Sequence, residues 1–237
     1  MNMAAQDKFW AVIPAAGSGN RMGTEIPKQY LKIRGRYILE YTVSRFTGVG
    51  AMQGIVVVIS ENDAYWHELE ASRNDRVMSA IGGRERYHSV LNGLYRLRDL
   101  AGDEDWILVH DAARPCVREQ DIRVLMENVK DHTVGGLLGV PARDTMKRAD
   151  ANEEIAETIP RQGLWHALTP QMFRKGMLQR AIEKAISERV EITDEAQAVE
   201  LAGFRPKLVA GHPDNIKITR MNDLPLAELF LSQQEQH

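Results

Sequence analysis

The sequence predicts an α/β fold in a single domain, with a mostly parallel, twisted sheet flanked by helices. Three observations lead to this prediction. Short apolar runs of strand length alternate with longer segments whose apolar residues recur at helical spacing. A glycine-rich loop directly follows the first apolar run. The 237 residues, 43% of them hydrophobic and 27% charged, suffice for one sizeable core but not for a second full domain.

The apolar runs are rich in Val, Ile and Leu and lie between helical segments, as expected of strands buried on both faces of a sheet. The predicted strands are Trp10–Ile13, Ile55–Ile59, Val77–Ala80, Trp106–Val109 and Gly136–Val140. Leu, Val and Met stripes mark the helices, and we interpret these stripes as core. The predicted helices are Ile38–Phe46, Arg86–Leu100, Gln120–Val129, Arg174–Ser187 and a run from Thr193 to Leu201. In such a sheet, ligands bind beyond the carboxyl ends of the strands.

The first such end carries the loop from Pro14 to Gly23. Gly17 and Gly19 allow a tight turn that offers backbone N–H groups to an anion, while Arg21 and Lys28 add positive charge nearby. A polyphosphate is the natural ligand. The loop lacks the third glycine of a dinucleotide fingerprint, since position 22 is methionine, and no P-loop pattern is present. The alternative interpretation is an ordinary glycine turn between a strand and a helix.

Two further polar segments fall at strand ends, namely Gly82–Arg86 and Val109–Pro115. Asp111 could hold a ribose hydroxyl or help to place a cation, or it could only cap a helix or form a turn. Its neighbour Arg114 favours a role in the cleft. His110 has no second ligand at metal spacing, so we predict that it packs in the core.

The sequence becomes polar and rich in charges between Pro141 and Gln171. This pattern predicts a β-hairpin arm, at about residues 141–163, that projects from the sheet. A hairpin alone is marginal in water, so we expect it to lie on a second copy of the chain in a homodimer. A solvated excursion without a partner is the alternative. Farther on, Lys217 is predicted on a short strand at the cleft, where it could meet a phosphate or be an ordinary surface charge.

The composition of the chain limits which partners it can bind and in which compartment we expect it. A net charge of −3 and a pI near 6.2 provide no general basic field for nucleic acid, so a bound polyanion should be small. Cys116 is the only cysteine, which excludes an intramolecular disulfide and a multi-cysteine metal site. No apolar stretch approaches the ~18 residues of a membrane span, and Met1–Lys8 lacks the features of a signal peptide. We therefore predict a cytoplasmic protein that binds neither nucleic acid nor membrane.

Eight motifs occur along the chain in one order, and together they resemble the 2-C-methyl-D-erythritol 4-phosphate cytidylyltransferase family of the non-mevalonate isoprenoid pathway. The resemblance runs from Val12 to about Leu231. The motifs are P-A-A-G-x-G-x-R-M, P-K-Q-Y, G-G-x-x-R-x-x-S-V, V-H-D-A-A-R-P, P-x-x-D-T-x-K, L-W-x-A-x-T-P-Q, T-D-E and N-I-K-x-T. The resemblance implies a Rossmann-like nucleotidyltransferase fold.

The resemblance also implies roles for individual residues. The cytosine and ribose of CTP would lie among Ala15, Ala16, Gly17, Gly83 and Ser89, and Asp111 would meet the ribose side of the reacting centre. Gly19 would also bind the nucleotide. The CTP phosphates would be held by the catalytic residues Arg21, Lys28 and Lys217. The methylerythritol phosphate would be bound by Arg114 and by Thr145 and Arg161 of the other subunit. Position 84 departs from the family pattern, because Arg84 stands where acidic or small residues are usual, and its side-chain role is open.

The implied reaction is attack of a phosphate-monoester oxygen on the α-phosphorus of CTP. Such a phosphate has a second pKa near 6, so no dedicated base is required. Mg²⁺ is expected to be carried by the CTP phosphates, and no protein metal site is predicted. Three alternatives are a ribitol 5-phosphate cytidylyltransferase, a nicotinamide dehydrogenase, which Met22 disfavours, and a nucleotide-binding regulator without catalysis.

Overall fold

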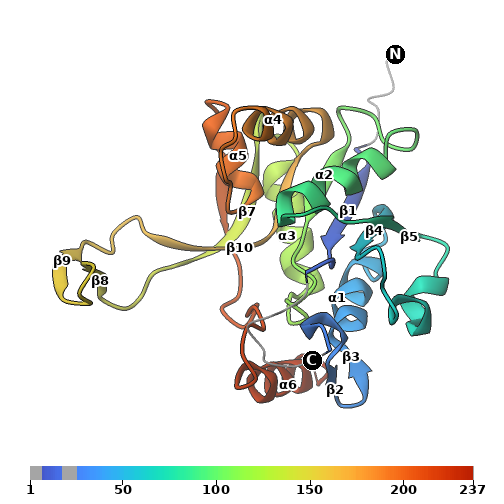
Figure 1. The fold of residues 1–237 in the computed structure, drawn as a ribbon, viewed down its shortest axis with the longest axis horizontal. Coiled ribbons are helices and arrows are strands. Elements are labelled where there is room, and N and C mark those ends of the chain that lie inside the picture. The colour runs from blue at the N-terminus through green and yellow to red at the C-terminus, as the bar shows by residue number, and fades with distance from the viewer. Residues whose placement is uncertain (1–6, 18–25, 237) are drawn as a thin grey trace.

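The computed structural model describes residues 7–17 and 26–236. Strands and helices alternate along most of this chain (Figure 1). The strands are β1 (Phe9–Pro14), β2 (Lys32–Ile33), β3 (Arg36–Tyr37), β4 (Met52–Ile59), β5 (Val77–Ile81), β6 (Trp106–Val109), β7 (Gly135–Pro141), β8 (Met146–Ala149), β9 (Ile155–Ile159), β10 (Trp165–Arg174) and β11 (Lys207–Ala210). The α-helices are α1 (Ile38–Thr47), α2 (Arg86–Arg96), α3 (Glu119–Val129), α4 (Lys175–Ser187), α5 (Glu195–Leu201) and α6 (Asp223–Gln234). Short 3₁₀ helices are η2 (Lys28–Tyr30), η3 (Trp66–Glu68) and η4 (Glu70–Arg73).

Within the described chain, seven strands form one sheet in the order β11-β7-β10-β6-β1-β4-β5. Its neighbouring strands pair in parallel except for β10, which runs antiparallel to both β6 and β7. This arrangement confirms the predicted single-domain α/β fold with a mostly parallel sheet. The antiparallel strand follows from the arm, because the chain leaves the sheet after β7 and returns beside it as β10.

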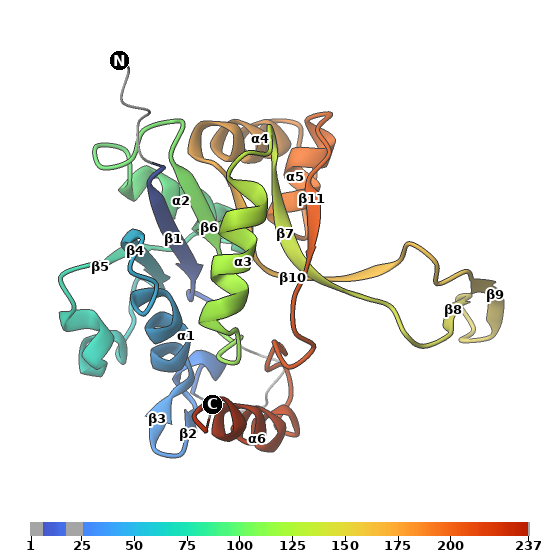
Figure 2. The same cartoon turned by 180° about the vertical axis from the view of Figure 1, so that it is seen from behind.

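Side chains of β1 alternate between two cores, as the period of a strand requires. Ala11 and Ile13 pack with α1 and α3 on one face, whereas Trp10 and Val12 pack with α2, α4 and α5 on the other. Figure 2 shows α1 and α3 lying over one side of the sheet. Burial of both faces accounts for the nearly continuous apolar sequence of these strands.

The predicted hairpin is present as β8 and β9, which pair antiparallel at the end of a long two-stranded extension. Most of its side chains are exposed, and Ile155 at the start of β9 is 67% exposed. In both views the extension stands away from the rest of the molecule (Figures 1 and 2).

Helix α6 covers a third, smaller core below the sheet. This core contains Ile33, Tyr41 and Cys116 together with Ala227 and Leu231 of α6. The Cys116 thiol lies 3.6 Å from the carbonyl oxygen of Ala227 and is fully buried. Gln234 ties the end of α6 to the body of the protein by donating to the carbonyl oxygen of Cys116.

The structure corrects two details of the sequence prediction. Lys217 does not lie on a strand, because residues 211–219 form an irregular segment that pairs with the sheet only at its beginning. Helix α2 ends at Arg96 rather than Leu100, since the last residues form turns. Strands β10 and β11 and helix α6 were not predicted.

None of the helices in the described residues is both long and apolar enough to cross a membrane.

Candidate active site

A cavity of about 270 Å³ opens beyond the carboxyl ends of β1, β5 and β6, next to the switch point of the sheet. Its lining residues come from segments far apart in the sequence: Pro14, Ala15, Ala16, Gly17, Lys28, Gln29, Gly83, Arg84, Glu85, Arg86, Ser89, Asp111, Ala112, Ala113 and Lys217. Eight of the predicted site residues are in this set, namely Ala15, Ala16, Gly17, Lys28, Gly83, Ser89, Asp111 and Lys217. The predicted residues Gly19 and Arg21 lie outside the described residues.

The side chain of Gln29 supports the first residues after β1. Its amide nitrogen donates to the carbonyl oxygens of Ala15 at 2.6 Å and Gly17 at 3.1 Å. The backbone N–H of Ala15 donates to Val58, which continues the pairing of β1 with β4. These contacts explain why the Pro27-Lys28-Gln29 motif follows the glycine loop so closely: Gln29 supports the loop and Lys28 lines the cavity beside it.

The opposite wall is the loop from Gly82 to Glu85. A Cβ at Gly82 would lie 2.3 Å from the Cβ of Ala16, and one at Gly83 would lie 2.5 Å from the Cβ of His88. Only glycine at position 82 allows this close approach to the first loop, and only glycine at position 83 allows the second loop to lie this close to α2. The hydroxyl of Ser89 accepts from the N–H of Gly83 at 3.1 Å and fixes the wall to α2.

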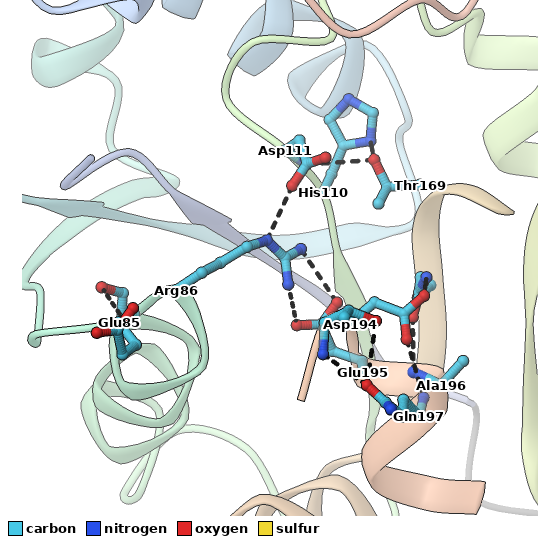
Figure 3. Close-up of polar contacts among 12 residues, drawn as sticks. Glu85, Arg86, His110, Asp111, Thr169, Asp194, Glu195, Ala196 and Gln197 are labelled. Carbon is cyan, nitrogen blue, oxygen red and sulfur yellow. Dashed lines mark hydrogen bonds and ion pairs between the residues drawn. The ribbon is translucent and has the colours of Figure 1, made fainter. Parts of the chain in front are cut away.

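Asp111 lies among three cations of the cleft, and its contact with Arg86 is drawn in Figure 3. One carboxylate oxygen accepts from Arg86 Nε at 2.9 Å, and the other lies 3.2 Å from Arg114 Nε and 2.9 Å from Lys217 Nζ. Burial alone would raise the pKa of this carboxyl, but the three cations outweigh burial and hold the pKa well below its usual range. Asp111 is therefore ionised at every physiological pH.

Arg86 joins Asp111 to a second buried carboxylate, Glu195, at the start of α5. Arg86 Nη1 and Nη2 donate to the two oxygens of Glu195 at 2.6 and 3.1 Å. The sequence motifs included both residues but gave neither a role. The sequence shows only that Arg86 and Glu195 each belong to a motif. The fold shows that the two residues meet.

The segment that carries Lys217 is positioned by backbone contacts. Arg114 Nη1 donates to the carbonyl oxygen of Asn215 at 2.7 Å, and the N–H of Ile218 donates to Ala113 at 2.8 Å. Lys217 lies between these two anchors, and its side chain is about one third exposed toward the cleft. The predicted cleft position of Lys217 is confirmed although its predicted strand is not.

His110 is completely buried behind the cleft, which confirms its predicted structural role. Its Nε2 lies 3.0 Å from the carbonyl oxygen of Arg114, and its Nδ1 lies 2.9 Å from the hydroxyl of Thr169. That hydroxyl also accepts from the N–H of Asp111. The carbonyl requires a donor at Nε2, so Nδ1 is the acceptor and the ring is neutral. Burial lowers the pKa of His110 to about 4.

Stability should therefore decrease in mild acid. Between pH ~6.5 and ~4 the unfolded chain binds a proton at His110 that the native protein does not, so the free energy of unfolding should fall by up to about 3 kcal/mol across this window. Above pH ~6.5 this contribution is fully present. Urea unfolding at several pH values measures the effect. The decrease should be smaller in His110→Gln and unchanged in the control His67→Gln, at an exposed histidine. Identical profiles for wild type and His110→Gln would contradict the assignment.

The remaining predicted residues divide between the cleft and the arm. Arg114 reaches the cleft through its ion pair with Asp111. Thr145 and Arg161 are exposed at the base of the hairpin and do not line the cavity of their own chain. Arg161 donates to the carbonyl oxygen of Arg143, so its guanidinium is held on the arm.

The cleft carries an excess of positive charge, because Arg86, Arg114 and Lys217 outnumber the carboxylates Asp111 and Glu195 with which they pair. Lys28 adds a further cation to the wall. The described residues include no cluster of three His, Cys, Asp or Glu side chains that could hold a metal ion. The positive charge of the cleft suits an anionic ligand.

Comparison with known proteins gives a consistent result. The family model of 2-C-methyl-D-erythritol 4-phosphate cytidylyltransferase matches residues 9–233. A protein with that name from Pseudomonas putida is 51% identical to this chain over 217 residues, which cover 91% of this chain and 92% of the relative. A protein with that name from Vibrio vulnificus is 48% identical over 225 residues, which cover 95% of each chain. The solved structure of the enzyme with this name from Francisella tularensis superimposes with a TM-score of 0.82 at 36% identity, over 94% of this chain and 100% of that one.

A second solved structure, of the enzyme with the same name from Thermus thermophilus, has a TM-score of 0.78 at 28% identity and covers 95% of this chain and 99% of that one. These matches support the family inferred from the eight motifs and do not support the ribitol phosphate alternative. The chain belongs to the 2-C-methyl-D-erythritol 4-phosphate cytidylyltransferase family.

Proposed function

We propose that this protein transfers the cytidylyl group of CTP to 2-C-methyl-D-erythritol 4-phosphate. An oxygen of the acceptor phosphate attacks the α-phosphorus of CTP, the bond from that phosphorus to the bridging oxygen of the β-phosphate breaks, and pyrophosphate leaves. The products are 4-diphosphocytidyl-2-C-methyl-D-erythritol and pyrophosphate. The observation that carries the proposal is family membership over nearly the whole chain, combined with a cationic cleft at the switch point of the sheet.

The nucleotide is proposed to bind between the two glycine loops. Gly17 and Gly83 present backbone to the cavity from opposite walls, and Ser89 and Ala16 support the second wall. This narrow gap suits one planar ring. Asp111 is proposed to lie at the ribose, and Lys28 and Lys217, with Arg21 of the first loop, at the triphosphate.

Catalysis would then depend on alignment and charge rather than on proton transfer. The attacking phosphate is largely ionised at neutral pH, so the lack of a catalytic histidine or cysteine in the cleft is compatible with this reaction. Fixed cations stabilise the charge that develops on the α-phosphate and on the departing pyrophosphate. Mg²⁺, if carried by the CTP phosphates, would reduce their negative charge, and no protein ligand cluster would be required to hold it. This proposal fits Asp111, whose two oxygens already contact cations of the protein.

The acceptor is proposed to bind at the junction of two subunits. Arg114 supplies the cleft side, and Thr145 and Arg161 would arrive on the arm of a partner in a homodimer with two-fold symmetry. The exposure of both strands of the β8–β9 hairpin supports this part of the proposal, because an isolated hairpin is marginally stable in water. The cytoplasm remains the proposed compartment, since the single cysteine suits a reducing environment.

One assay tests the function. Pyrophosphate release should require CTP, Mg²⁺ and methylerythritol phosphate together, and ribitol 5-phosphate should be a poor acceptor. ATP and GTP should react at least about 100-fold more slowly in kcat/KM, because a gap closed by backbone around one ring excludes two rings. Equal rates with ribitol 5-phosphate would contradict the assigned acceptor, and equal rates with purine nucleotides would contradict the assigned base pocket.

A further inference from the structure

A line of alternating charges crosses the cleft from α5 to the loop at Lys217. It begins at Glu195 and continues through Arg86 to Asp111 (Figure 3). It ends at Lys217, whose ammonium contacts Asp111. The shortest contact of each successive pair along it is 2.6 to 2.9 Å. Glu195 is 1% exposed and lies behind the cavity wall, so it does not line the cavity itself.

Arg86 is committed to this line. Its Nε donates to Asp111 and both terminal nitrogens donate to Glu195, so every nitrogen of the guanidinium donates to a carboxylate. The planar guanidinium fork fixes the angle between the two carboxylates, which a lysine could not do. Arg86 is therefore poorly placed to bind a phosphate directly.

The end of the line at Glu195 is held in place by hydrogen bonds to the start of α5. Gln171 of β10 accepts from the N–H of Ala196 at 2.7 Å and donates to Asp194 at 2.9 Å, which fixes the first turn of α5 to the sheet. Asp194 also caps α5 by accepting from the N–H of Gln197. Glu195 thus projects from a fixed point toward Arg86.

A buried ion pair such as Arg86–Glu195 is weak evidence for stability, because well-packed apolar residues of similar volume often serve as well. What apolar residues could not do is direct Arg86 Nε at Asp111. We propose that Glu195 and Arg86 are a positioning pair that sets the orientation of Asp111 and, through it, the place of the Lys217 ammonium at the reacting phosphate. Both act through other residues, because Glu195 does not line the cavity and every guanidinium nitrogen of Arg86 donates to a carboxylate. The inference rests on the proposed function for its kinetic consequence.

The first test is Glu195→Gln, which keeps the shape of the side chain and removes its charge. The value of kcat should fall by at least about 10-fold, because a small displacement of a group at the reacting centre has a large effect on rate. The KM for CTP should stay within about threefold of wild type. Glu200→Gln, at an exposed position on the same helix, is the matched control and should leave both constants unchanged.

The decisive variant is the double substitution Arg86→Met/Glu195→Leu, which replaces the pair by apolar residues of similar volume. The midpoint of thermal unfolding should be close to that of wild type, while kcat stays at least about 10-fold lower. Recovery of kcat together with stability would overturn the proposal, because the pair would then be only structural. If the double variant does not fold, a normal kcat in folded Glu195→Gln overturns the proposal and a lowered kcat supports it.

The inference can fail separately from the proposed function. If wild type releases no pyrophosphate from CTP with either acceptor, the function is wrong, and a crystal structure of Glu195→Gln then decides the inference. Separation of Lys217 Nζ from Asp111 beyond hydrogen-bond distance supports it, whereas an unchanged contact overturns it.

Discussion

Replacing Lys217 with alanine is expected to lower kcat by at least about 100-fold, which corresponds to a loss of about 2.7 kcal/mol of transition-state stabilisation. The lysine ammonium lies at the cleft on a segment fixed to Ala113 and Arg114, so it can stabilise negative charge without rearranging. Asp111 keeps its contacts to Arg86 and Arg114 in the variant, so the fold should persist. Initial rates of pyrophosphate release and circular dichroism measure the two effects.

The matched control is Lys207→Ala on β11. Lys207 is an exposed lysine ten residues before Lys217, and its ammonium contacts the carbonyl oxygen of Asn128 rather than the cleft. The control should retain wild-type kcat. Turnover by folded Lys217→Ala within threefold of wild type would remove Lys217 from the proposed catalytic residues.

Complementation between two inactive variants should restore activity if the active site is shared between subunits. Lys28 lines the cleft of its own chain, whereas Arg161 lies on the arm and outside that cleft. A mixed dimer of Lys28→Ala and Arg161→Ala would hold one intact site and one doubly altered site. Random exchange of equal amounts makes about half of the dimers mixed, so activity should approach about a quarter of wild type.

Each variant alone should remain near background, and exchange should be verified by subunits of distinct mass. The reference for exchange is the double variant, with Lys28→Ala and Arg161→Ala in the same chain, mixed with wild type. If mixed dimers form and no activity returns, Arg161 acts within its own chain or has no role in the reaction.

The proposed nucleotide side of the site could be predicted from the sequence, because the residues on that side come directly after the ends of buried strands. Once β1, β5 and β6 are recognised as parallel, Gly17, Gly83 and Asp111 must meet at one edge of the sheet. The position of Lys217 was harder to predict, because the alternation in Ile216–Ile218 resembles a strand. Its backbone instead pairs with the loop at Ala113, which is fixed by tertiary contacts rather than local pattern.

The contact between Arg86 and Glu195 could not be predicted from either motif alone. The two residues are 109 positions apart, and their contact depends on β10 returning antiparallel to the sheet and placing α5 beside α2. The same return was missed because Trp165–Arg174 contains a proline and a histidine that obscure the strand pattern. Side-chain pairing across such distances requires the topology first.

The burial of Cys116 beneath α6 makes this protein convenient for spectroscopic labelling. Burial raises the pKa of the Cys116 thiol to about 12, so hardly any thiolate forms at neutral pH and alkylating reagents have no nucleophile to meet. A cysteine introduced on the exposed arm would then be the only reactive thiol of the chain. In the proposed homodimer, spin labels or fluorophores at that position would report the distance between the two arms in solution, with no need to remove the native cysteine first.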